Sequence, residues 1–110
     1  MLTEPDDELT QVIAMLQDDC MAKLPAAIAE IGDFWLCLIA GEAPLTDLPN
    51  MVAKAHGLAG AGAMFGLPAL KMAARDLEQH LEAIRVASRR PNSVERERFT
   101  VLMTALQRAA

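Results

Sequence analysis

The stretch that decides the fold spans residues 51–66 and reads Met51-Val52-Ala53-Lys54-Ala55-His56-Gly57-Leu58-Ala59-Gly60-Ala61-Gly62-Ala63-Met64-Phe65-Gly66. At about 100° per residue, a helix here gathers its apolar residues on one stripe. The stripe residues are Met51, Ala55, Leu58, Gly62 and Phe65. His56 falls roughly 140° from the centre of that stripe. We therefore predict a core helix whose single imidazole faces outward.

Small side chains surround His56 on the outer face of this predicted helix, where Lys, Glu or Arg is usual. The residues of that face are Val52, Ala53, Ala59, Gly60 and Ala63. A glycine inside a helix costs about 1 kcal/mol relative to alanine. Gly62 is explained by close helix packing in the stripe, whereas Gly60 lies one turn after His56. We interpret this face as a clearance and docking surface for a partner's active site.

The composition favours one helical domain and excludes several function classes. A chain of 110 residues forms a single domain, and 4% aromatic residues with no Tyr argue against strands. The net charge of -5 argues against nucleic acid as a partner. The longest apolar run, residues 34–40, is far below the roughly 20 residues of a membrane span. The acidic start is the reverse of a signal peptide, so we expect no membrane segment.

The cysteines indicate a reducing compartment. Cys20 and Cys37 fall in one predicted helical region, where their separation along the helix is about 25 Å. That distance excludes a disulfide between them, so we expect free thiols in a cytoplasmic protein. The two Cys and two His show no short metal-binding spacing, and we predict no metal site.

The first helical segment is expected from Glu8 to about Ala40. Residues 1–7 read as a loose acidic lead-in, which leaves 8–110 as the single bundle domain. Pro25 interrupts the helical pattern, so we expect either two helices or one that is kinked near residues 23–24. The apolar positions of this segment are Leu9, Val12, Ile13, Leu16, Ile28, Ile31, Trp35, Leu38 and Ile39.

Three further helices complete the predicted bundle. Thr46 or Asp47 is expected to cap the helix that carries His56. Gly66 ends that helix and Pro68 opens the next one. The stripe of that third bundle helix is Leu70, Ala74, Leu77, Leu81 and Ile84. Ser93 is expected to cap the last helix. Its apolar candidates are Val94, Phe99, Val101, Leu102 and Leu106.

Short loops between these segments predict an all-α fold. The arrangement is an antiparallel, up-down four-helix bundle with a kinked or additional N-terminal helix.

If the chain reverses at Leu67, residues equally far from it lie level on the two helices. His56 precedes Leu67 by as many residues as Glu78 follows it, and Glu78 lies at the edge of its helix's core stripe. We predict that Glu78 orients the imidazole by accepting the Nδ1 proton, which leaves Nε2 as the nucleophile. Lys71 and Arg75 share that outer side and are expected to attract a phosphoryl group or an acidic partner.

These residues resemble the histidine-containing phosphotransfer (HPt) domain. The family pattern is His-x-Leu-Lys-Gly, then small residues, a Gly after the helix and a Leu-Glu further on. Here the run from His56 to Gly66, followed by Leu70 and then by Leu77 and Glu78, is similar to it. The resemblance covers roughly residues 51–82. It implies that His56 accepts and donates a phosphoryl group.

The resemblance also implies the partners, which are a hybrid sensor kinase and the receiver domain of a response regulator. The receiver would supply Mg²⁺ and the catalytic residues, so this chain would need no cofactor of its own and would not be an autonomous enzyme. One departure is Ala59, where the family often has a lysine that helps to hold the phosphoryl oxygens. Lys54 and Lys71 are the candidates to replace that lysine.

Three functional classes fit these observations. The first is a relay that carries phosphate on His56, and the second is a non-phosphorylated module that docks on a receiver or kinase. The third is a generic helical bundle or hydrolase, for which no second nucleophile or base constellation appears. The glycines after His56 are no nucleotide loop, since no strand precedes them and no Lys-Ser/Thr follows. We favour the relay. We expect a free-standing shuttle, and an excised domain of a longer protein would show the same pattern.

Overall fold

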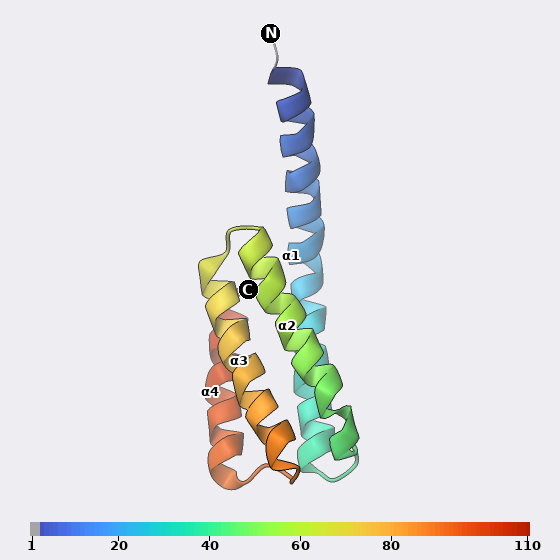
Figure 1. The fold of residues 1–110 in the computed structure, drawn as a ribbon, viewed down its shortest axis with the longest axis vertical. Coiled ribbons are helices and arrows are strands. Elements are labelled where there is room, and N and C mark those ends of the chain that lie inside the picture. The colour runs from blue at the N-terminus through green and yellow to red at the C-terminus, as the bar shows by residue number, and fades with distance from the viewer. Residues whose placement is uncertain (1–2) are drawn as a thin grey trace.

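The computed structural model describes residues 3–110, with side chains from residue 8 onward. Its elements are α1 (Thr3–Ile39), the short 3₁₀ helix η1 (Leu45–Asp47), α2 (Leu48–Met64), α3 (Pro68–Ala87) and α4 (Ser93–Ala109). Consecutive helices run antiparallel, up and down (Figure 1). The described part of the chain contains no strand, so the predicted all-α bundle of four helices is confirmed. None of its helices combines the length and apolar character needed to cross a membrane.

Apolar side chains from all four helices fill one core. α2 and α3 form the most extensive pair, α3 packs on α4, and α1 closes the bundle against α2 and α4. The indole of Trp35 in α1 stacks on Phe99 in α4, with ring centroids 3.9 Å apart. The fully buried large side chains are Ile31, Leu38, Leu48, Met51, Leu70, Leu77, Leu81, Ile84 and Leu106. The predicted stripe of α3 is buried, and so is that of α2 up to Gly62, whereas Phe65 follows the end of α2, is only half-buried and lies outside the core.

The α2–α3 hairpin is held close by two glycines. A Cβ on Gly62 would lie 2.6 Å from the backbone nitrogen of Lys71, so only glycine permits this approach. Gly66 has a φ of 68°, in the left-handed region that ends helices. Pro68 then opens α3. This tight turn fixes which residues of α2 and α3 lie level with each other.

The N-terminal part of α1 differs from the prediction. The helix begins at Thr3, so residues 3–7 are helical rather than loose, while residues 1–2 lie outside the described chain. Acidic residues near a helix N-terminus favour its dipole, and Pro5 lies in the first turn, where proline is tolerated. The helix also continues past Pro25, so one helix, rather than the two considered, covers residues 3–39. Pro25 has no N–H to donate to the carbonyl oxygen one turn earlier in the helix. Because Pro25 is exposed, water can hydrogen-bond that oxygen instead.

Several apolar residues of α1 lie outside the core. Figure 1 shows that the N-terminal half of α1 extends beyond the α2–α3 turn, where no other helix accompanies it. The exposed apolar side chains of this half include Leu9, Val12, Ile13 and Leu16. The core of α1 begins at Leu24. An apolar stripe shows which face of a helix can pack against a neighbour, but it does not show how far along the helix that neighbour extends.

The N-cap of α4 lies one residue earlier than predicted. Asn92, not Ser93, is the N-cap, and it forms a capping box in which its side chain accepts from the Glu95 N–H. Val94 and Val101 are exposed, contrary to prediction. The buried stripe of α4 is Phe99, Leu102, Met103 and Leu106. That spacing follows the helical period, which Val94 and Val101 do not share. Asp47 is the N-cap residue of α2, but no hydrogen bond to its side chain forms because η1 precedes it.

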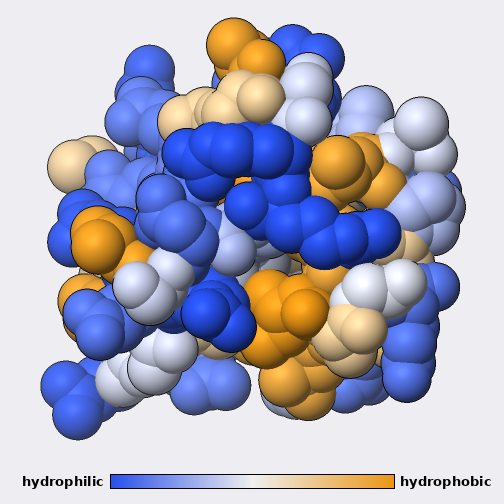
Figure 2. All heavy atoms as spheres, turned by 90° about the horizontal axis from the view of Figure 1, so that it is seen from below, coloured by the Kyte–Doolittle hydropathy of each residue, from blue (hydrophilic) through white to orange (hydrophobic). Residues whose placement is uncertain are grey.

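One arginine joins the two loops at the far end of the bundle. The Nη1 atom of Arg90 donates to the carbonyl oxygens of Leu38, at 2.7 Å, and Ala43, at 2.9 Å. It thereby ties the segment before α4 to the end of α1 and to the loop that follows, where the Leu38 carbonyl also accepts from the Gly41 N–H. Seen from below, this end of the molecule is mainly hydrophilic with separate hydrophobic patches (Figure 2). The pair Arg89-Arg90 in the sequence gave no sign of this contact.

Candidate functional site

The candidate site lies on α2 and α3, about midway along the bundle. His56 projects from the outer face of α2, and 78% of its side chain is exposed. Its Nδ1 atom lies 2.7 Å from Oε2 and 3.1 Å from Oε1 of Glu78 on α3. The side chain of Glu78 is only 20% exposed, because it leans across the helix seam. The hairpin register thus brings together the two residues that the sequence placed level.

This contact determines which imidazole nitrogen is free. An ionised carboxylate only accepts hydrogen bonds, so Nδ1 of His56 carries the proton and donates to Glu78. In the neutral ring Nε2 then holds the lone pair. Because the ring is exposed, that nitrogen is open to a reactant from solvent. The arrangement presents a nucleophile without a catalytic base.

The face around His56 is open. Nothing lies within 4 Å of a Cβ placed on Gly57 or Gly60, so the fold does not require either glycine for packing. Ala53 and Ala63 are exposed, as predicted for the outer face. Val52 and Ala59 differ, because both are partly buried against the core. The predicted surface therefore has an open centre and a half-buried edge toward α3.

A shallow pocket gathers the candidate residues. Its lining consists of His56, Ala59, Gly60, Lys71, Arg75 and Glu78. Lys71 and Arg75 enter it from α3, one turn apart. Neither cation forms an ion pair with any residue whose side chain the structure describes. All of these lining residues were candidates from the sequence. Lys71 and Arg75 thus lie beside the imidazole with no ion-pair partner among the described side chains.

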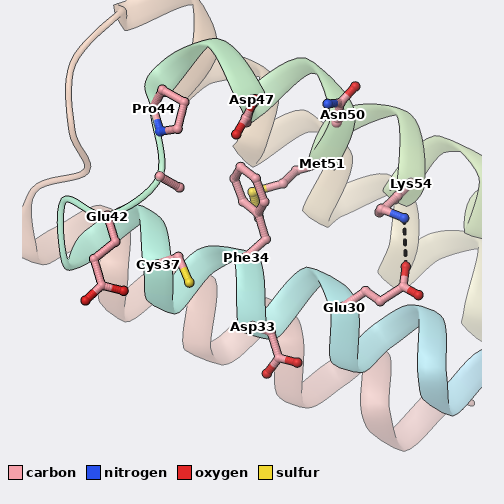
Figure 3. A pocket seen from close by; sticks show the side chains of 11 residues that line it. Glu30, Asp33, Phe34, Cys37, Glu42, Pro44, Asp47, Asn50, Met51 and Lys54 are labelled. Carbon is pink, nitrogen blue, oxygen red and sulfur yellow. Dashed lines mark hydrogen bonds and ion pairs between the residues drawn. The ribbon is translucent and has the colours of Figure 1, made fainter.

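Lys54 does not reach this pocket. Its Nζ lies 2.7 Å from Oε2 of Glu30 on α1, and it lines a different hollow, between α1 and α2 (Figure 3). Two residues along a helix are about 200° apart, so Lys54 and His56 face nearly opposite directions. Lys54 therefore joins two helices, and of the two lysines considered only Lys71 stands near the imidazole. Phe34 and Met51 line the same hollow.

The second histidine is part of the bundle. His80 is half-buried on α3, and its Nε2 lies 2.9 Å from the carbonyl oxygen of Glu95 at the start of α4. Since a carbonyl oxygen only accepts, Nε2 of His80 carries the proton and has no free lone pair. Cys20 and Cys37 are free thiols on α1. Among the described residues, no cluster of His, Cys, Asp or Glu is arranged to hold a metal ion.

An exposed histidine, held by a carboxylate on the face of a helical bundle, presents a nucleophilic nitrogen to a reactant from solvent. The Hpt domain family model matches residues 11–109. The chain therefore belongs to the Hpt domain family, whose members are helical bundles and phosphocarriers. Membership supports a histidine phosphotransfer role in a phosphorelay, in which such domains interact with receiver domains and kinases. No curated protein and no solved structure matches the chain.

Proposed function

We propose that His56 carries the phosphoryl group between the receiver domain of a hybrid sensor kinase and that of a response regulator. The observation that carries this proposal is the contact between Nδ1 of His56 and Glu78, on a ring that is 78% exposed. It combines a fixed tautomer with free access to Nε2. A relay needs both, because the same atom must meet two partners in turn.

The proposed step balances without any group from this chain beyond the imidazole. The Nε2 lone pair attacks the phosphorus of an aspartyl phosphate, the P–N bond forms, and the P–O bond breaks. The electron pair of that bond returns to the aspartate as its carboxylate. The ring gains positive charge while Nδ1 keeps its proton, and the Glu78 carboxylate at 2.7 Å stabilises that charge. Return of the phosphoryl group to a second aspartate reverses each change.

Positive charge near the phosphoryl oxygens comes from two sources in this proposal. The partner receiver supplies Mg²⁺ and its own catalytic residues, and phosphoryl transfer depends mainly on such charge and on alignment. On this chain, Lys71 and Arg75 line the pocket beside His56. We propose that Lys71 takes the place of the lysine that the family often has at the position of Ala59. We place this phosphoryl transfer in the cytoplasm, because thiols such as the free Cys20 and Cys37 stay reduced there.

Phosphoryl transfer from phosphorylated receivers and hybrid kinases tests the proposal. The variant is His56→Gln, and the matched control is His80→Gln, because these are the only two histidines of the chain. The expected result is acid-labile, base-stable label on the parent and on His80→Gln, with none on His56→Gln. Label that survives in His56→Gln would overturn the assignment. Circular dichroism of both variants checks that the bundle is intact.

A docking module that is never phosphorylated is the second candidate. It is favoured by Ala59, which leaves the helix of His56 without the lysine usual in the family. This alternative predicts that receiver binding survives in His56→Gln while no donor labels the parent. The same set of variants therefore separates the two functions.

A further inference from the structure

The hollow between α1 and α2 is largely apolar and lies apart from the pocket of His56. Its apolar lining includes Phe34 from α1, Ala43 and Pro44 from the loop that follows, and Met51 from α2. Phe34 points into the space between the two helices (Figure 3). The volume of the hollow is about 650 Å³. Grooves between helices receive the apolar face of a partner helix in one common mode of recognition.

Contacts within the chain hold both ends of this hollow. At one end, Nζ of Lys54 on α2 lies 2.7 Å from Oε2 of Glu30 on α1, which joins the two helices. At the other end, Arg90 donates to the carbonyl oxygens of Leu38 and Ala43 and so holds the loop after α1. A surface that is already formed loses less conformational entropy when a partner binds.

Three carboxylates at the rim of the hollow have no cation beside them. Asp33, Glu42 and Asp47 line the hollow, and we call them the rim carboxylates. None of them forms an ion pair with any residue whose side chain the structure describes. Asp33 and Glu42 are exposed, and Asp47 is half-buried. The hollow therefore combines an apolar lining with negative charge that nothing in the described chain balances.

The rim carboxylates are part of an uneven distribution of charge along the chain. Residues 1–66 contain ten acidic residues and two lysines, whereas residues 67–110 contain eight basic and five acidic residues. The side of the bundle formed by α1 and α2 is thus the acidic one. Such a surface repels nucleic acids and anionic membranes, whose phosphates attract Lys and Arg. A second copy of this chain, with its net charge of -5, is also a poor match. The complementary occupant is a cationic segment of another protein.

We propose that the hollow binds a basic amphipathic helix of a partner protein, in which large apolar side chains are flanked by Lys or Arg. The apolar side chains enter beside Phe34 and Met51, and the basic side chains meet the rim carboxylates. The α1 wall from Glu30 to Cys37 is about 10 Å long, which corresponds to about two turns of a partner helix.

A second apolar groove on α1 offers a comparison within the same chain. It lies between α1 and the end of α2 and is lined by apolar residues that include Leu16 and Phe65. The acidic residue that lines it, Asp19, is neutralised by Lys23 at 2.9 Å. A partner that needs both apolar contact and negative charge should therefore prefer the hollow. Each of the two places contains one thiol, Cys37 in the hollow and Cys20 in the second groove.

A helix in the hollow leaves His56 accessible. Lys54 is the lining residue nearest to His56 in the sequence, and it lies about 200° away around α2. A partner bound in the hollow can thus stay attached while His56 meets a receiver. The inference does not depend on the proposed function, because binding in the hollow involves no phosphoryl group.

Alkylation of the two cysteines tests the proposal on the unaltered chain. The probe is a synthetic peptide of about 15 residues, or roughly four turns of helix, with a stripe of leucines flanked by lysines. Its matched control has serines in place of the leucines. At a concentration about ten times the dissociation constant, the leucine peptide should slow alkylation of Cys37 about tenfold. Alkylation of Cys20 should not change, and the serine peptide should protect neither thiol.

Variants of the rim carboxylates test the role of charge. Asp33→Asn combined with Asp47→Asn removes two of them, whereas Asp18→Asn combined with Asp76→Asn makes the same change in net charge at exposed positions away from the hollow. Fluorescence anisotropy of the labelled leucine peptide measures the affinity. The first pair should weaken binding about tenfold, and the second pair should leave it nearly unchanged. Added salt should weaken binding to the parent more than to the first pair.

Three results would overturn the proposal. They are a parent chain that does not bind the leucine peptide, equal protection of Cys20 and Cys37, and equal weakening by the two pairs of substitutions. Circular dichroism of each variant establishes that the bundle is intact, so a loss of binding reports on the hollow.

Discussion

Nδ1 of His56 and Oε2 of Glu78 are 2.7 Å apart across the seam of α2 and α3, although the residues are 22 positions apart in the chain. The contact exists because the tight turn around Gly66 and Leu67 sets the two residues level. It joins an exposed ring to a mostly covered carboxylate. The chemistry that we propose for the protein rests on this pair.

Glu78→Gln should slow phosphoryl transfer to His56 roughly 5- to 30-fold, which corresponds to about 1–2 kcal/mol. The amide keeps an acceptor for the Nδ1 proton but loses the charge that stabilises the phosphorylated ring. Single-turnover transfer from a phosphorylated receiver measures the effect. The control is Glu82→Gln, one turn further along α3, because Glu82 pairs with Arg85 instead. Equal rates for the two variants would contradict the role given to Glu78.

Gly60→Gln should reduce transfer by roughly a hundredfold, since bulk beside His56 keeps the two reacting atoms apart. The same change should leave the free energy of unfolding within about 1 kcal/mol of the parent, because glutamine favours helix and space is open at this position. Thermal denaturation and transfer rates on the same sample separate the two effects. Unchanged transfer would refute the clearance interpretation.

Gly62→Ala should show the opposite pattern and destabilise the fold by about 1–2 kcal/mol. Its Cβ would meet the Lys71 backbone at 2.6 Å, and backbone cannot move aside as a flexible side chain does. The higher helix propensity of alanine offsets only about 1 kcal/mol of that strain. Urea denaturation measures the difference. A variant as stable as the parent would show that the helices separate at little cost.

Lys71→Ala should lower the transfer rate several-fold and weaken its dependence on salt, because an uncommitted cation near the phosphoryl oxygens is lost. Lys54→Ala is the matched control, since Lys54 pairs with Glu30 in a different hollow. We expect that control to transfer at the parental rate. If Lys54→Ala is the slower variant, the replacement for the missing lysine lies on the other side of α2.

The cap of α4 should make stability depend on pH on the acid side. Hydrogen bonds from Arg89 and from the Asn92 backbone N–H hold the pKa of Glu95 below the ordinary 4.5. This contribution is present above pH 4.5 and is lost as pH falls through the lowered pKa. Glu95→Gln should therefore flatten the fall of the unfolding free energy below pH 4.5. A parallel fall in parent and variant would contradict this account.

Much of the site could be predicted because helix geometry is regular. A constant rise per residue places His56 level with Glu78 once the turn is located, and the angle per residue turns His56 outward. The same reasoning located the stripes of α2 and α3. It also put Lys71 and Arg75 on the side of α3 that reaches the imidazole.

Other features depend on contacts that periodicity does not encode. The stripe of α1 looks the same where it enters the core at Leu24 and where it extends past α2 at Leu16. Asn92 and Ser93 are both good caps, and the capping box with Glu95 decided between them. The Lys54–Glu30 pair and the Arg90 contacts join residues distant in sequence.

The most direct measurement is a phosphorus–nitrogen NMR correlation on isotope-labelled protein after transfer from a phosphorylated receiver. The account predicts phosphorus bonded to Nε2 of His56, with the proton retained on Nδ1 beside Glu78. Phosphorus on Nδ1, on His80 or on no histidine would contradict it.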